Sequence, residues 1–155
     1  MIQLAEEFFA TKNDPEQISV TPEVMERLRH IHPASLSEYN DGNGPVAWVL
    51  LIPTTHYLME RFVAEEISEQ ELLDETPLEG KYDAIYLCSA LVLPEHRGKG
   101  HAKRLMCDAI KVIRKNHPIE HLFYWAFSEQ GEKLAASGAE ALGIPLHSRP
   151  MSPRD

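Results

Sequence analysis

Apolar residues recur along the chain in blocks whose spacing changes from helical to extended and back. The N-terminal third is expected to be helical, with its apolar positions on one face: Leu4, Phe8, Phe9, Val24, Leu28 and Ile31. Thr21-Pro22 is typical of a helix start, because Thr caps the first turn and Pro is tolerated at its first position. Pro33 should end this helix.

Three largely apolar runs between turn residues predict strands: Val46–Ile52, Asp83–Leu93 and His121–Phe127. The first strand follows the clearest loop in the sequence, Asn40–Pro45, which is dense in Asn, Asp and Gly. A short last strand is expected at Ile144–His147. Residues 148–155 are expected to form a tail.

Segments with helical spacing separate these strands: Thr55–Ile67, Lys99–Lys115 and Gln130–Leu142. The acidic stretch Ser68–Glu75 is expected to add a short turn of helix. Gly138 weakens the last helix and Gly143 should stop it. Strands that alternate with helices indicate a mixed α/β layered fold, and 155 residues fit one domain.

Composition narrows the range of partners. With 24 acidic residues against 15 basic ones, the formal charge is -9, which argues against nonspecific binding to nucleic acid. An acidic surface could attract a cationic amine, but many cytosolic proteins are acidic for solubility alone, and solubility is the preferred interpretation. No window holds the roughly 18 apolar residues that a membrane span needs, and the first residues include acids. We therefore expect a cytoplasmic protein with no membrane partner.

Neither cysteine nor histidine spacing indicates a metal site. Cys88 and Cys107 match no zinc or redox motif and are expected to be buried, reduced thiols. Six of the eight histidines form three close pairs, but no pair has a third ligand at a recognisable spacing: His30 and His32, His96 and His101, and His117 and His121. No metal is therefore expected.

The junction between the second strand and the following helix combines several features of an anion site. Its sequence is Arg97-Gly-Lys-Gly-His-Ala102. The first turn of a helix offers N–H groups without intrahelical partners and the positive end of the helix dipole. Gly98 and Gly100 lack a Cβ, which allows close approach to the backbone. Basic residues surround the same point: Arg97, Lys99, Lys103 and Arg104. Phosphate or pyrophosphate is the expected occupant.

Two common phosphate motifs do not fit this junction. A P-loop requires Gly-Lys followed by Ser or Thr, whereas Gly100 is followed by His101. A dinucleotide-binding fingerprint requires Gly-x-Gly-x-x-Gly, and the sixth position from Gly98 is Lys103. The remaining alternative is a glycine-rich turn that carries basic residues by chance.

The stretch Leu91-Val-Leu-Pro-Glu-His-Arg-Gly-Lys-Gly-His-Ala102 resembles the signature of the GNAT superfamily of acyl-CoA-dependent N-acetyltransferases. That signature is an apolar strand ending in Val-x-Pro, two residues, then Arg or Gln-x-x-Gly-x-Gly or Ala, and every fixed position is filled. The match is specific over about Ala84–Ile113. The resemblance implies a GNAT-like domain over residues 1–155. Its mixed, mostly antiparallel central sheet would be flanked by helices, with two strands splayed apart to form the acyl-CoA cleft.

The resemblance also implies which residues hold acetyl-CoA, the expected co-substrate. The main chain of Ala90, Leu91 and Val92 would pair with the pantetheine arm. The pyrophosphate would lie on the amides of Arg97, Gly98, Lys99, Gly100, His101 and Ala102. An N–H near Leu91 could polarise the thioester carbonyl, and an amine would then attack directly, without a covalent enzyme intermediate.

The proton-transfer groups depart from the family pattern. Many members carry a tyrosine on the last helix that protonates the departing thiolate, whereas Gln130–Gly143 contains none. Ser137 or Ala139 falls at its place, depending on the alignment, and Tyr124 on the preceding strand is another candidate donor. The base that neutralises the amine is open among three residues: Glu60, His56 and Tyr86. For each, ordinary surface or core packing is the alternative.

A second departure precedes the long strand, where the family commonly has a hairpin. This chain instead has Val46–Ile52, followed by a long connection with a helix at Thr55–Ile67. The insertion, residues 54–80, is expected to lie over the acceptor side and to help define the substrate.

The leading hypothesis is an N-acetyltransferase that acts on a primary amine of a small molecule or peptide. A non-catalytic acyl-CoA-binding module is the second, and the missing tyrosine favours it. An interaction protein whose glycine turn binds simple phosphate, or nothing, is the third. The sequence leaves open whether the chain forms a homodimer.

Overall fold

The computed structural model describes residues 21–40, 42, 44–93, 100–125 and 129–149. Its elements are α2 (Pro22–Ile31), β1 (Leu36–Asn40), β2 (Pro45–Thr54), α3 (His56–Val63), α4 (Glu69–Glu75), β3 (Ala84–Val92), α5 (His101–Asn116), β4 (His121–Trp125), α6 (Glu129–Leu142) and β5 (Leu146–Arg149). The expected apolar face at Leu4, Phe8 and Phe9 lies outside the described residues, as do residues 150–155.

The five strands form one sheet in the order β1-β2-β3-β4-β5. The pairings of β1 with β2 and of β2 with β3 are antiparallel, and those of β3 with β4 and of β4 with β5 are parallel. The predicted mixed α/β sheet is therefore confirmed, and its antiparallel pairings are the longer ones.

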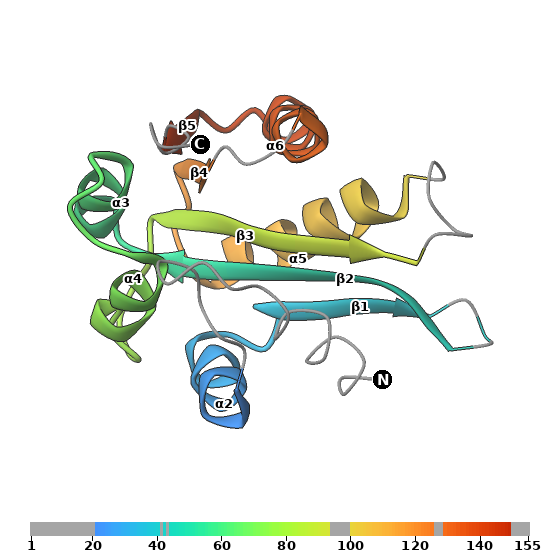
Figure 1. Cartoon of the computed structure of the whole chain (residues 1–155), viewed down its shortest axis with the longest axis horizontal. Coiled ribbons are helices and arrows are strands. Elements are labelled where there is room, and N and C mark those ends of the chain that lie inside the picture. The colour runs from blue at the N-terminus through green and yellow to red at the C-terminus, as the bar shows by residue number, and fades with distance from the viewer. Residues whose placement is uncertain (1–20, 41, 43, 94–99, 126–128, 150–155) are drawn as a thin grey trace.

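Helices cover both faces of the sheet (Figure 1). On one face lie α2, α3 and α4. The other face carries α5, which packs on β1, β2 and β3 and contacts α6. β2 is consequently buried from Val46 to Thr54, which explains why its sequence is almost continuously apolar. None of the helices in the described part of the chain is long and apolar enough to span a membrane.

The ends of several helices are set by capping side chains and by one glycine. The side chain of Thr21 accepts a hydrogen bond from the amide of Val24, and Thr55 caps α3 in the same way. Ser68 begins α4 with a capping box that includes Glu71. Gly143 ends α6 in the left-handed region, with φ of 68°.

Gly138 allows α5 and α6 to pack closely. A Cβ at this position would lie 2.2 Å from the Cε atom of Met106 on α5. The glycine that weakens α6 as an isolated helix is therefore a contact point between the two helices.

The expected helical connection between Val46–Ile52 and the long strand is confirmed, because α3 and α4 separate β2 from β3. Two other features of the strands differ from the sequence predictions. Leu36–Asn40, for which no strand was expected, forms β1 and pairs with β2 in a hairpin. The side chain of Asn40 accepts hydrogen bonds from the amides of Gly42 and Gly44 in the connecting loop. The expected tail also begins too early, because Ser148 and Arg149 belong to β5.

The predicted helix Thr55–Ile67 is shorter than expected. α3 ends at Val63, and two residues later Glu65 adopts a positive φ of 64°, which does not continue a right-handed helix. The connection between β2 and β3 therefore contains the short helix α3 and, as expected for the acidic stretch Ser68–Glu75, a second short helix, α4.

Arg27 joins α2 to the C-terminal end of α4. Its Nε atom donates to the carbonyl oxygen of Leu73 at 3.1 Å, and its Nη2 atom donates to those of Asp74 at 2.9 Å and Thr76 at 3.0 Å. The last carbonyls of a helix lack regular intrahelical donors. The amide of Thr76 donates to the carbonyl of Leu73, and the guanidinium adds a second donor there and bonds the carbonyls of Asp74 and Thr76.

We predict that Arg27→Met lowers the free energy of unfolding by about 1–3 kcal/mol, the usual range for hydrogen bonds that involve a charged group. Urea denaturation measures this change. Arg29→Met removes the same charge from an exposed position of the same helix and should change stability by less than about 0.5 kcal/mol. Equal losses in the two variants would show that the contact with α4 contributes nothing specific.

Candidate active site

The candidate site forms where β3 and β4 stop pairing. Within the described ranges, their parallel pairing joins Ala84–Tyr86 to His121–Phe123. Beyond this point β3 stays paired with β2 as far as Val92, and β4 stays paired with β5 as far as Trp125. β3 thus continues beside β2, and β4 continues beside β5. The predicted splaying of these two central strands is confirmed.

A β-bulge in β3 lies next to this point. Leu50 of β2 pairs with Ser89 and Leu51 pairs with Leu87, so Cys88 is an extra residue in β3. A bulge bends its strand and increases the local twist, and bulges are frequent beside active sites. The bulge follows the last residue of β3 that pairs with β4, Tyr86, by two positions.

The residues expected to hold the pantetheine arm lie beyond the bulge. Ala90, Leu91 and Val92 pair with β2 through Val49, Trp48 and Ala47. They therefore occupy the part of β3 that has parted from β4. This is the position at which an extended ligand could lie along the strand.

The start of α5 has the backbone geometry that an anion site requires. Gly100 is the N-cap residue in the left-handed region, with φ of 77°, and it supplies no capping side chain. A Cβ at this residue would meet no atom of the described residues within 4 Å, so the space beside it is open as far as these residues are concerned. The first intrahelical bond runs from the amide of Arg104 to the carbonyl of Gly100, so the helix provides no acceptor for the amides of Ala102 and Lys103.

The structure describes the second half of the predicted pyrophosphate loop. Arg97, Gly98 and Lys99 lie outside the described residues. Gly100, His101 and Ala102 are described and lie at the start of α5. This start lies at the same end of the molecule as the C-terminal end of β3 (Figure 1). The structure therefore brings the strand and helix halves of the predicted site to one end of the sheet.

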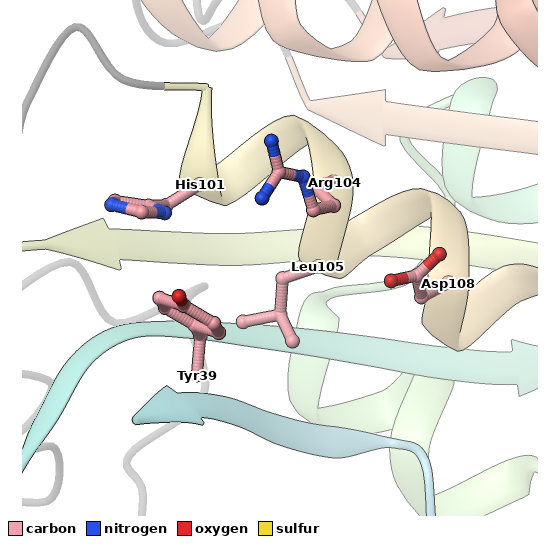
Figure 2. A pocket seen from close by; sticks show the side chains of 5 residues that line it. All are labelled: Tyr39, His101, Arg104, Leu105 and Asp108. Atoms are coloured by element: carbon pink, nitrogen blue, oxygen red, sulfur yellow. The ribbon is translucent and has the colours of Figure 1, made fainter. Parts of the chain in front are cut away.

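The side chain of His101 points away from this junction and toward β1. Its ring stacks on that of Tyr39, with centroids 4.8 Å apart. The two rings border a shallow hollow of about 110 Å³, which is also lined by Arg104, Leu105 and Asp108 (Figure 2). Any contact of His101 with the predicted pyrophosphate is therefore expected through its main chain.

On the opposite face of the sheet, a buried carboxylate lies beside the bulge. Glu69 of α4 is only 4% exposed. The hydroxyl of Tyr86 donates a hydrogen bond to its Oε2 atom, and the thiol of Cys88 donates to the same oxygen at 3.7 Å. Burial, and next the negative charge of Glu69, raise the pKa of Tyr86 well above 10. Tyr86 is therefore a hydrogen-bond donor at neutral pH and not a base.

Aromatic rings and one buried cation surround this group. Phe62 of α3 packs on Tyr86 at 4.8 Å and on Trp125 at 6.0 Å between ring centroids. The guanidinium of Arg149 lies 4.7 Å from the ring centroid of Phe62 and 4.4 Å from that of Trp125, and its Nη1 atom donates to the carbonyl of Ile67 at 2.8 Å. The positive charge of Arg149 acts against burial and Glu69, and it offsets part of the rise in the pKa of Tyr86.

The three predicted catalytic residues lie on three different elements. Tyr124 is half-buried on β4, between Phe123 and Trp125, and therefore faces α5 and α6 rather than Phe62. Ser137 is half-buried on α6, and Glu60 is exposed on α3. Their catalytic roles remain predictions.

Glu60 and His56 lie near the N-terminal end of β3. The Nδ1 atom of His56 is 2.6 Å from Oδ2 of Asp83, and its amide donates to Oδ1. The hydrogen bond to Asp83 is the main cause of a raised pKa of His56, to which Glu60 adds a smaller effect. Along β3, Asp83 is about 16 Å from Cys88 at about 3.3 Å per residue. This end of the strand is therefore remote from the bulge.

Sequence reasoning missed Glu69, Cys88 and Arg149 as parts of one site. The signal for Glu69 was present, because four buried residues recur at helical spacing in and after α4: Glu69, Leu72, Leu73 and Thr76. Glu69 therefore belongs to the buried stripe of the helix. Throughout the part of the chain that the structure describes, no group of three or more potential ligands is placed to hold a metal ion.

A comparison with protein families agrees with this geometry. The model of the acetyltransferase (GNAT) family matches residues 1–137, which include α2 to α5, β1 to β4 and the first part of α6. No curated protein and no solved structure matches the chain. Since the family model covers most of the sequence, the chain belongs to the acetyltransferase (GNAT) family.

Proposed function

We propose that this protein transfers the acetyl group of acetyl-CoA to a primary amine of a small molecule or peptide, in the cytoplasm. The observation that carries the proposal is the parting of β3 from β4 immediately before the segment that leads to α5. An extended arm could bond to the main chain of Ala90–Val92, while the start of α5 at Gly100 takes the negative charge of the pyrophosphate. Membership of the family supports acyl transfer in general.

The reaction requires the amine to be neutral when it attacks. Its nitrogen then forms a bond to the thioester carbonyl carbon, and the carbonyl oxygen gains negative charge that a main-chain N–H of β3 could stabilise. Collapse of this intermediate breaks the C–S bond. The thiolate of coenzyme A leaves and takes up one proton, and the product is an amide.

The group that protonates the thiolate remains a prediction, with Tyr124 and Ser137 as the candidates. A non-catalytic acyl-CoA-binding module is the alternative. One observation favours it, namely that α6 contains no tyrosine. Direct protonation by solvent would also permit turnover without such a residue.

We predict that Gly100→Asn weakens acetyl-CoA binding at least tenfold while the protein stays folded. Asn tolerates the left-handed region, so folding should change little, but its side chain would enter the open space beside the helix start. Gly100→Val should lose additional stability, about 1–2 kcal/mol, because a β-branched residue is strained there. Calorimetric titration and urea denaturation separate the two effects.

Gly143→Asn is the matched control for this experiment. Gly143 has φ of 68° and equally open surroundings, but it lies at the C-terminal end of α6. Its substitution should leave acetyl-CoA affinity unchanged. If folded Gly100→Asn binds as tightly as the unchanged protein, the pyrophosphate does not lie at the start of α5.

We further predict that acetyl-CoA is consumed in the presence of a suitable primary amine, as measured by release of the coenzyme A thiol across a panel of amines and peptides. Reaction with a primary amine but not with its tertiary analogue would identify N-acetylation. Tight binding of acetyl-CoA without turnover of any amine would favour the binding-module alternative.

A further inference from the structure

We propose that Glu69 is the general base that accepts the proton of the acceptor amine, and that the amine reaches it at the Cys88 bulge. This inference rests on the proposed acetyl transfer and deepens it. Burial of a charge is unfavourable, and a carboxylate is seldom as buried as Glu69 unless its charge is compensated.

The carboxylate lies where the two central strands separate. Tyr86 is the last residue of β3 that pairs with β4, and Cys88 is the extra residue of the bulge. Glu69 accepts hydrogen bonds from both side chains, through the same oxygen atom. It is thus attached to β3 between the end of the β4 pairing and the residues proposed to bind the pantetheine arm.

Among the described neighbours of Glu69, Tyr86 and Arg149 fix the carboxylate, whereas Cys88 lies in a more accessible position. Tyr86 is buried, packs on Phe62 and keeps its proton, so it orients the carboxylate as a donor. Arg149 supplies positive charge nearby. Cys88 is only half-buried, and its thiol is 3.7 Å from the carboxylate. An amine that approaches along β3 would therefore meet Glu69 beside Cys88.

α4 holds this carboxylate on a rigid support. The helix starts with a capping box at Ser68, and its C-terminal carbonyls are bonded by Arg27. Leu72 and Leu73 belong to the same buried stripe of the helix as Glu69. A base placed on a packed helix keeps a constant distance to the strand that would carry the thioester.

The chemistry balances with one proton released overall. The primary ammonium group gives one proton to the Glu69 carboxylate and becomes a neutral amine. Its nitrogen forms the new C–N bond to the thioester carbon, the C–S bond breaks, and a second proton from nitrogen neutralises the coenzyme A thiolate. Glu69 then returns its proton to solvent. A buried carboxylate favours the binding of a small cationic group such as a primary ammonium group. The acceptor is therefore a primary amine.

The test compares Glu69→Gln with Glu71→Gln, both on α4. Glu71 is exposed, and Gln also completes a capping box, so this control should keep full activity. Glu69→Gln should bind acetyl-CoA normally but lose about 10²- to 10⁴-fold in kcat/KM at neutral pH, the usual contribution of a general base. The loss should shrink as the pH approaches the pKa of the amine, because the neutral amine then needs no base. A loss that rising pH does not restore would mean that Glu69 is only structural.

Tyr86→Phe provides a second test that does not require a change at Glu69. A hydrogen bond to a carboxylate favours its charged form, so removing the hydroxyl raises the pKa of Glu69. The acidic limb of the plot of kcat against pH should therefore move to higher pH. Cys88 and Arg149 are unchanged in this variant. If the acidic limb does not move, the inference is overturned. This test remains decisive even if Glu69→Gln fails to fold.

The outcomes separate this inference from the proposed function. If the unchanged protein acetylates an amine and folded Glu69→Gln does so equally well at neutral pH, acetyl transfer stands and the base is another group. If the unchanged protein binds acetyl-CoA but acetylates no amine, the proposed function fails, and the assignment of Glu69 fails with it.

Discussion

The short parallel pairing between β3 and β4 is the constraint on which the rest of the site depends. It joins only Ala84–Tyr86 to His121–Phe123 in the described structure. A longer pairing would use the main-chain groups of β3 for the sheet and leave none for a ligand. Here β3 is held by β2 and β4 by β5, so the sheet remains continuous on both sides while its centre opens.

The opening also explains how a carboxylate can be buried in an otherwise apolar layer. Glu69 lies among aromatic residues, where an isolated charge would be strongly unfavourable. Tyr86 and Cys88 donate to it, and Arg149 adds a buried positive charge in the same region. Buried charges of this kind contribute little net stability, because desolvation offsets their attraction. Their presence beside a parted strand is more readily explained by chemistry than by folding.

Local signals in the sequence predicted most of the fold. Thr21 caps a helix, and the apolar run Val46–Ile52 lies within a strand covered on both faces. These predictions succeed because each depends on interactions between residues close in sequence, or on burial that excludes polar side chains. The order of alternating strands and helices then left few possible arrangements.

The errors arise where pairing with a distant segment decides the structure. Leu36–Asn40 has no clear alternation, and it becomes a strand because β2 lies beside it. Arg149 looks like part of a polar tail, yet it pairs with Trp125 and is buried over two aromatic rings. Glu69 and Cys88 are 19 positions apart, and only the packing of α4 on β3 brings them together. The glycine-containing junction was recognised because its residues are contiguous, whereas the groups around Glu69 are not.

The two helices between β2 and β3 give the chain a modular organisation. The residues proposed to hold the acyl donor all come from one uninterrupted stretch, Ala90–Ala102, whereas the proposed base comes from a separate connection that α2 supports through Arg27. Under the proposed assignments, mutations in that connection would change which amines are accepted without altering the stretch proposed to bind the donor.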